Sequence, residues 1–215
     1  TGPARATIAY AGSREAGRRK VDLTIKPVRF RPSAVHAPPP GSLLPVSEAD
    51  DHRFMGAALK EARMALAKGD FPVGCVLAYR NRVIARGRRK GTAGGAGNEL
   101  DHAEMVALRR LIKMKPAPEA GAVIAYCTME PCLMCFGALM LHGIGSVVYA
   151  YEDAMGGGTG CPRERMNPLY RENPVVVRPG VRRGESLGLF KAFFSDPAHS
   201  YWRGSHLAAY TLKQP

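Results

Sequence analysis

The sequence contains no long run of apolar residues. A membrane-spanning helix needs roughly 18 or more consecutive apolar residues, and no window of this chain approaches that length. Cysteine is also scarce, with five among 215 residues. Secreted disulfide scaffolds are smaller and usually carry an even number of cysteines. The sequence therefore predicts no membrane span and a location in the reducing cytoplasm.

Acidic residues are few compared with basic ones. Asp and Glu together number 18 against 31 Lys and Arg, which gives a formal net charge of +13 at pH 7. Such an excess favours a polyanionic partner such as RNA, because basic side chains bind phosphates and release their counterions. The alternative is a basic surface that only keeps the protein in solution. The charge by itself does not separate the two.

The chain divides by composition into three parts. Residues 1–46 form a basic, proline-rich N-terminal extension, with eight Lys or Arg against two acidic residues. Its run of prolines at residues 38–40 is typical of a linker or an extended arm, although residues 21–30 permit an edge strand. Residues 47–195 carry the periodic patterns of a folded domain, and residues 196–215 form a C-terminal extension.

Hydrophobic periodicity in the folded part predicts strands that alternate with helices. Ser47 followed three residues later by Asp50 has the form of a capping box, and apolar residues at helical spacing continue to Leu66. The expected strands are residues 71–79, 83–87, 122–128 and 146–151, and the further helices are residues 103–112, 131–141 and 185–194. This order indicates an α/β fold, in which helices cover a sheet.

Two short motifs carry side chains that bind metals. One is His-Ala-Glu at residues 102–104, the other Cys-Leu-Met-Cys at residues 132–135, and each opens a predicted helix. Cysteines three residues apart at a helix start place both sulfurs on one face, where the helix N-terminus favours thiolates. The two cysteines, Cys132 and Cys135, and His102 together make three ligands for Zn²⁺. They leave the fourth position open, as in catalytic zinc sites. Zinc there activates water, and Glu104 is placed to act as general acid and base.

The cysteine pair has two other interpretations. A Cys-x-x-Cys pair is a redox dithiol in thioredoxin-like proteins, but the flanking sequence here is not of that type. A structural zinc site usually has four protein ligands, and the chain contains no second Cys-x-x-Cys. The two motifs together, in this order, have the form found in zinc-dependent nucleobase deaminases. The combination favours hydrolysis of the exocyclic amine of a nucleobase.

At these motifs the chain resembles the cytidine deaminase superfamily, and within it the bacterial tRNA adenosine deaminases. The resemblance runs from about residue 48 to residue 194 and is most marked in residues 71–77, 102–108, 128–139 and 143–149. It implies a three-layer cytidine-deaminase-like fold, with a five-stranded mixed sheet flanked by helices, and a homodimer. It also implies a zinc-dependent deaminase domain over residues 47–195, with backbone groups near Ala103 and Glu130 in contact with the base or the water.

One position departs from the resembled family. That family usually places a base-binding asparagine just after the second strand, and Arg89 stands at this position here. Arg89 is therefore a candidate substrate-binding residue, and its chemistry bears on which base is bound.

Three functions are compatible with these observations. The first is conversion of adenosine to inosine at the wobble position of tRNA, with the base splayed into the zinc pocket; the positive charge supports it. The second is deamination of a free base, nucleoside or nucleotide of guanine, cytosine or cytidine type, which Arg89 supports. The third is a nucleic-acid-binding module that zinc only folds. Glu104 argues against the third, because a structural site has no use for a carboxylate at an open position.

Several other residues have two interpretations. Cys75 and Cys127 lie in predicted strands and are expected in the core. Tyr170, Phe193 and Trp202 are expected either to stack on an extruded base or to pack in the core.

Overall fold

The computed structural model describes residues 46–215 except residues 96 and 120. Nearly all of the expected N-terminal extension, including the permitted strand over residues 21–30, lies outside the described residues. The α-helices of the described part are α1 (Glu48–Leu66), α2 (Ala103–Leu111), α3 (Leu133–Leu141), α4 (Pro168–Arg171), α5 (Arg183–Ser195) and α6 (His206–Lys213). Its strands are β1 (Gly74–Tyr79), β2 (Arg82–Arg88), β3 (Ile124–Met129), β4 (Ser146–Tyr151) and β5 (Val176–Arg178), with short 3₁₀ turns at η1 (Ala93–Gly95) and η2 (Arg163–Arg165). Within this part, no helix is both long and apolar enough to cross a membrane.

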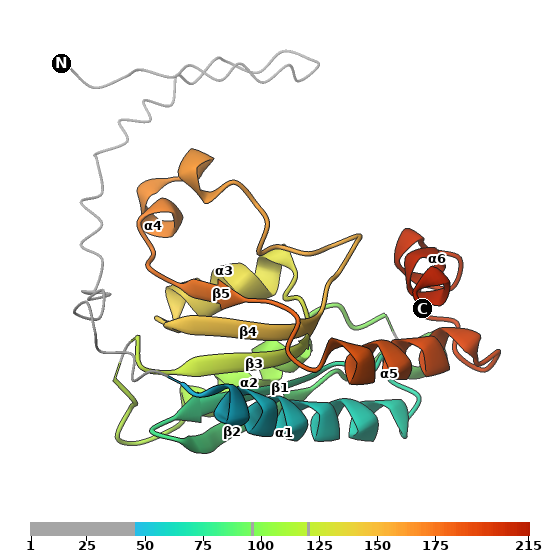
Figure 1. Ribbon diagram of the computed structural model, residues 1–215, viewed down its shortest axis with the longest axis horizontal. Helices are drawn as coiled ribbons and strands as arrows, with labels where there is room; N and C mark the ends of the chain where they lie inside the picture. Colours follow the sequence, from blue (N-terminus) through green and yellow to red (C-terminus); the bar gives the residue numbers. More distant parts are fainter. Residues whose placement is uncertain (1–45, 96, 120) are drawn as a thin grey trace, which may run out of the picture. The chain divides into compact units, whose positions relative to one another are not determined.

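The strands form one mixed sheet in the order β2-β1-β3-β4-β5 (Figure 1). β1 runs antiparallel to β2 and β3, whereas β3, β4 and β5 are parallel. β1 and β2 form a hairpin whose turn residues, Arg80 and Asn81, both have positive φ, 46° and 61°. A turn of this kind suits the right-handed twist of paired strands. The expected α/β fold with a five-stranded mixed sheet is confirmed.

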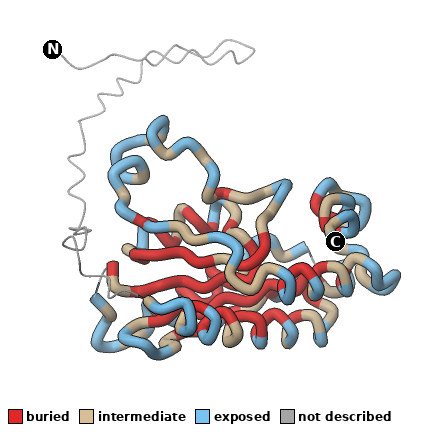
Figure 2. Tube along the Cα trace, in the orientation of Figure 1, coloured by how far each residue is buried: buried red, intermediate tan, exposed pale blue. Residues whose placement is uncertain are grey.

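Helices cover both faces of the sheet and give the fold three layers (Figure 1). Successive strand residues point to opposite faces, so Cys75 and Leu77 of β1 join one core while Val76 and Ala78 join the other. α2 and α3 pack on the first core, and α1 packs on the second. Because both faces are covered, every residue of β3 is buried, and Figure 2 shows the buried strands between helices with exposed outer sides.

Local sequence signals decide where the helices begin. The Ser47 hydroxyl caps α1 by accepting a hydrogen bond from the backbone N–H of Asp50 (3.1 Å), as the capping box predicts. His102 and Cys132 are the N-cap residues of α2 and α3. The helix expected over residues 131–141 therefore starts two residues late, because Cys132 has an extended backbone (φ −65°, ψ 169°). Both metal-ligand motifs thus lie at helix N-termini.

Three elements go beyond the sequence-based expectation. β5 is an edge strand of three residues and α4 a helix of four, both too short to show a hydrophobic period. α6 lies in the C-terminal segment and packs against α5. Its Ser205 cap accepts a hydrogen bond from Ala208 N (3.1 Å), and Leu207 is fully buried. The C-terminal segment therefore adds to the first core.

Candidate active site

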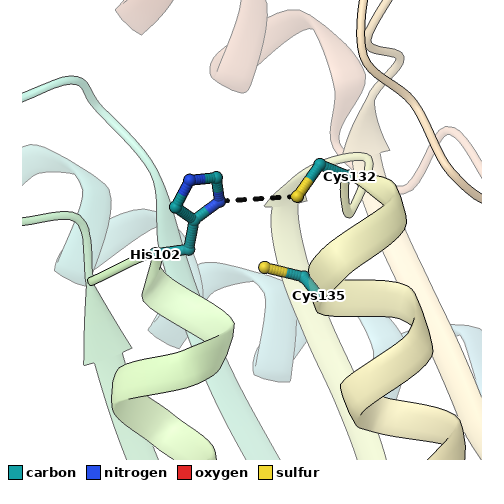
Figure 3. Close-up of side chains that lie close together, drawn as sticks. All are labelled: His102, Cys132 and Cys135. Carbon is teal, nitrogen blue, oxygen red and sulfur yellow. Dashed lines mark hydrogen bonds between the residues drawn. The ribbon is translucent and has the colours of Figure 1, made fainter. Parts of the chain in front are cut away.

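The two motif helices begin close to each other, so that His102, Cys132 and Cys135 point toward one another (Figure 3). His102 Nδ1 lies 3.6 Å from Cys132 Sγ, and the ligand atoms of all three residues lie within 4.8 Å of one another. A tetrahedral zinc ion with Zn–N and Zn–S bonds of roughly 2.0 and 2.3 Å separates two such ligands by roughly 3.5 Å. The donor set and its spacing therefore fit Zn²⁺ with three protein ligands.

The two cysteines of the cluster differ in acidity. A hydrogen bond from the Cys135 thiol lowers the pKa of Cys132 to about 4, and His102 acts in the same direction. That same hydrogen bond, together with burial, raises the pKa of Cys135 far above its usual range. Zinc, when bound, would be held by both sulfurs as thiolates.

Glu104 lies in the first turn of α2 and is only 3% exposed. Burial disfavours the charged carboxylate and raises the pKa of Glu104 above the usual glutamate value. A carboxyl group with a pKa closer to neutrality takes up and gives up a proton more readily, as a general acid and base must. The environment of Glu104 therefore suits proton transfer.

The cluster opens on a pocket that is partly open to solvent and encloses about 480 Å³ of empty space, part of it continuous with solvent. The residues on its walls include Phe71, Arg89, His102, Ala103, Glu104, Glu130, Cys132, Asp153, Tyr201 and Trp202. Cys135 lies behind the wall and is fully buried. The structure thus brings all the site residues predicted from the sequence to one place.

The stretch that carries the three ligands and Glu104 matches a known family. The model of the cytidine and deoxycytidylate deaminase zinc-binding region matches residues 48–151. The tRNA-specific adenosine deaminase of Bacillus subtilis (strain 168) is 33% identical over 149 residues, which cover 68% of this chain and 89% of that protein. The tRNA-specific adenosine deaminase 2 of Danio rerio is 35% identical over 167 residues, covering 74% of this chain and 77% of that protein. The chain belongs to the cytidine and deoxycytidylate deaminase family.

The fold agrees with this family. A solved structure from a study of A-to-I editing by tRNA:A34 deaminases at the wobble position of transfer RNA is 27% identical. It superimposes with a TM-score of 0.51 over 64% of this chain and 98% of that one. The protein is therefore a hydrolytic deaminase, and the expected Zn²⁺ cofactor is confirmed. When bound, the ion supplies Lewis-acid activation of water.

In this deaminase, the Glu130 side chain holds the loop that follows β4. Its carboxylate accepts hydrogen bonds from the backbone N–H groups of Asp153 (3.2 Å) and Thr159 (3.1 Å) and from the Thr159 hydroxyl (2.5 Å). A Cβ on Gly157 would lie 2.5 Å from that carboxyl group and would have to push it away from its hydrogen-bond partners. The side chain is thus occupied within the protein. Ala103 and Glu130 both line the pocket, and the substrate contacts of their backbone groups stay a prediction.

Arg89 of the deaminase directly follows β2 and is 2% exposed. Its Nη2 donates to Glu99 Oε2 (2.8 Å) and to the Tyr201 hydroxyl (3.2 Å), and that hydroxyl donates to Glu99 (3.0 Å). Sequence reasoning missed Glu99 and Tyr201. Tyr201 is 112 positions from Arg89 and Glu99 lies in an irregular loop, so no periodicity or spacing indicates either contact.

The remaining candidates divide between core and pocket. Cys75 and Cys127 lie opposite each other on β1 and β3, with sulfurs 3.8 Å apart, and both are fully buried. This agrees with the core interpretation. Phe193 is also buried in the core, and Tyr170 packs against that core, whereas Trp202 lines the pocket.

Proposed function

We propose that this deaminase converts adenosine to inosine in tRNA, at the wobble position of the anticodon. The observation that carries the proposal is the pocket, which places buried Glu104 beside His102 and Cys132. The similarity to tRNA-specific adenosine deaminases supports the choice of substrate. In this reaction water adds to C6 of adenine, the bond from C6 to the exocyclic nitrogen breaks, and ammonia leaves.

Glu104 moves the protons of this reaction. It takes a proton from the attacking water and delivers it to N1, the ring nitrogen beside C6. It then takes the second proton from the hydroxyl now bound to C6 and delivers it to the departing amine, so that adenosine and water yield inosine and ammonia. Because Glu104 is buried and lines the pocket, its proton passes to the substrate rather than to bulk water.

Aromatic side chains suit the pocket to a base pulled out of an RNA stack. Tyr201 and Trp202 stack on each other, with ring centroids 5.1 Å apart and planes at 12°, and line the pocket with Phe71. RNA-binding proteins place splayed bases against such rings. The net charge of +13 attracts the phosphates on either side. We place the enzyme in the cytoplasm, where tRNA is used.

We also propose that the enzyme is a homodimer. α3 exposes Leu133, Met134 and Leu141, with exposed fractions of 55%, 37% and 48%. Ile112, just after the neighbouring α2, is 56% exposed. A group of large apolar side chains on one helical layer is typical of an interaction surface. A second copy of the chain, related by a twofold axis, would pack its own α2 and α3 against these residues and remove the apolar side chains of both copies from water.

Inosine formation in a defined RNA tests the function. Zinc-loaded protein is incubated with an anticodon stem-loop carrying adenosine at the wobble position, and the digest is analysed by mass spectrometry. A stem-loop with guanosine at that position is the control. We expect inosine from the first RNA only, and no ammonia from adenine, guanine, cytosine or cytidine supplied free. Ammonia from a free base or nucleoside alone would favour the small-molecule deaminase that Arg89 permits.

A further inference from the structure

Arg89 has one nitrogen that the protein does not use. The side chain is buried and lies on the pocket wall. Its Nη2 is held by Glu99 and Tyr201. Its Nη1 is buried as well, yet it has no hydrogen-bond partner among the described residues.

An unpaired buried donor calls for a partner from outside the chain. Burying a donor without an acceptor destabilises a protein, and more so when the donor is charged. A guanidinium has only donors, so the missing partner is an acceptor. Over residues 46–215, as far as they are described, the other unpaired buried side-chain nitrogen is Nε of Arg178. Arg178 does not line the pocket, whereas Arg89 does.

We propose that Arg89 is a specificity-determining residue whose Nη1 donates a hydrogen bond to a ring nitrogen of the target adenine. The inference rests on the proposed function, since it takes adenine as the base. The ring acceptors of adenine are N1, N3 and N7. N1 receives its proton from Glu104, which leaves N3 or N7 for Arg89.

Glu99 and Tyr201 are the positioning residues of this contact. Glu99 Oε2 lies 2.8 Å from Arg89 Nη2 and 3.7 Å from His102 Nε2, so it connects the guanidinium to a metal ligand. The Arg89 guanidinium also lies 5.6 Å from the centre of the Tyr201 ring. A planar guanidinium held at one nitrogen has its other N–H groups fixed in direction. Nη1 is therefore directed before any substrate arrives.

The contact excludes some bases as well as binding others. Arg89 cannot accept a hydrogen bond. A base that turned an amine or a ring N–H toward Nη1 would set two donors against each other and leave both without partners. The pocket therefore selects a base that presents an acceptor at this point.

A cycle that pairs substrate changes with a protein change tests the proposal. Wild-type enzyme and Arg89→Met are compared on stem-loops carrying adenosine, 7-deazaadenosine or 3-deazaadenosine at the wobble position. We expect Arg89→Met to lower kcat/KM on adenosine roughly 10- to 100-fold. One of the two analogues lowers kcat/KM of the wild type by a similar factor and causes no further loss in Arg89→Met, because both changes remove the same hydrogen bond.

The result that overturns the proposal is independence of the two changes. If both analogues lower kcat/KM by the same factors in wild type and Arg89→Met, Nη1 does not bind a ring nitrogen of the base. Failure of the wild type to convert the unmodified stem-loop would overturn the proposed function, and this inference with it.

Controls separate this contact from damage to the fold. Arg86→Met changes an arginine of β2, the strand that Arg89 follows. Arg86 is not among the pocket residues, and we expect unchanged kcat/KM. Zinc content and melting temperature show whether Arg89→Met folds. If it does not, Tyr201→Phe, which removes the hydroxyl that contacts both Nη2 and Glu99, takes its place in the cycle, with a smaller loss expected. Additive losses with Tyr201→Phe would again contradict the proposal.

Discussion

At the residue scale, two half-buried cysteines differ in whether they belong to the metal-binding cluster. Cys132 and Cys161 are both free thiols, but only Cys132 lies in the cluster with His102 and Cys135. We expect Cys132→Ser to lose zinc and activity and to melt at a lower temperature, because serine is a poor zinc ligand. Cys161→Ser is expected to keep both. Zinc per chain and thermal melting measure this, and a zinc-replete Cys132→Ser would contradict the ligand assignment.

At the residue scale, the sequence predicts the site residues that lie within short motifs and misses the contacts between residues far apart in the chain. The ligands and Glu104 could be found because the spacing within each of the two motifs is short and typical of a metal site at a helix start. The sequence also points to Arg89, as a departure from a resembled family. Its two partners could not be found, because the contact with Tyr201 forms only when the C-terminal segment packs against the loop that carries Glu99.

At the scale of elements, a carboxylate just after β4 ties α5 and α6 to the sheet. Glu152 accepts hydrogen bonds from Arg183 Nε (2.8 Å) and from the Tyr210 hydroxyl (2.8 Å). The Arg183 guanidinium is the main reason why the pKa of Glu152 lies below its usual value. Because the pKa is lower in the folded state than in the unfolded one, this stabilisation is complete above the unfolded pKa. It is lost as pH falls through the folded pKa.

Glu152→Gln tests this link between elements. We expect a drop in Tm of roughly 1–4 °C at pH 7, as for a partly exposed ion pair in a domain of this size. The difference from wild type should shrink as pH falls through the lowered pKa of Glu152. Glu172→Gln changes an exposed carboxylate that, among the described residues, pairs with its neighbour Arg171, and it should leave Tm unchanged. Thermal melting over a pH series measures both, and a Glu152→Gln deficit independent of pH would contradict the role of the charge.

Element prediction succeeds where a segment is long enough to show a period. α1, α2 and the central strands have their apolar residues at helical or alternating spacing, and each is present in the structure. β5 has three residues, none of them fully buried, and its place beside β4 is a property of the whole sheet. α6 packs against α5 through few apolar side chains. Its sequence pattern therefore does not predict where it packs.

At the scale of the whole molecule, the exposed apolar residues of α3 predict self-association. Leu141 on α3 and Leu212 on α6 are equally exposed, at 48%. We expect Leu141→Glu to weaken the dimer, because a charge would be buried in the interface, and Leu212→Glu to leave it intact. Size-exclusion chromatography with light scattering reports the mass. A monomeric wild type, or equal effects of the two changes, would contradict the proposed interface.

The reaction itself is tested most sharply in water enriched in oxygen-18. Wild-type enzyme and Glu104→Gln, each with its zinc content measured, are incubated with the adenosine stem-loop, and the inosine is analysed by mass spectrometry. We expect the wild type to form inosine that carries one heavy oxygen at C6, since the oxygen comes from water. Glu104→Gln should keep its zinc and lose roughly 100- to 10,000-fold in rate. Unlabelled inosine, or a zinc-loaded Glu104→Gln as fast as the wild type, would contradict hydrolysis by Glu104 at this site.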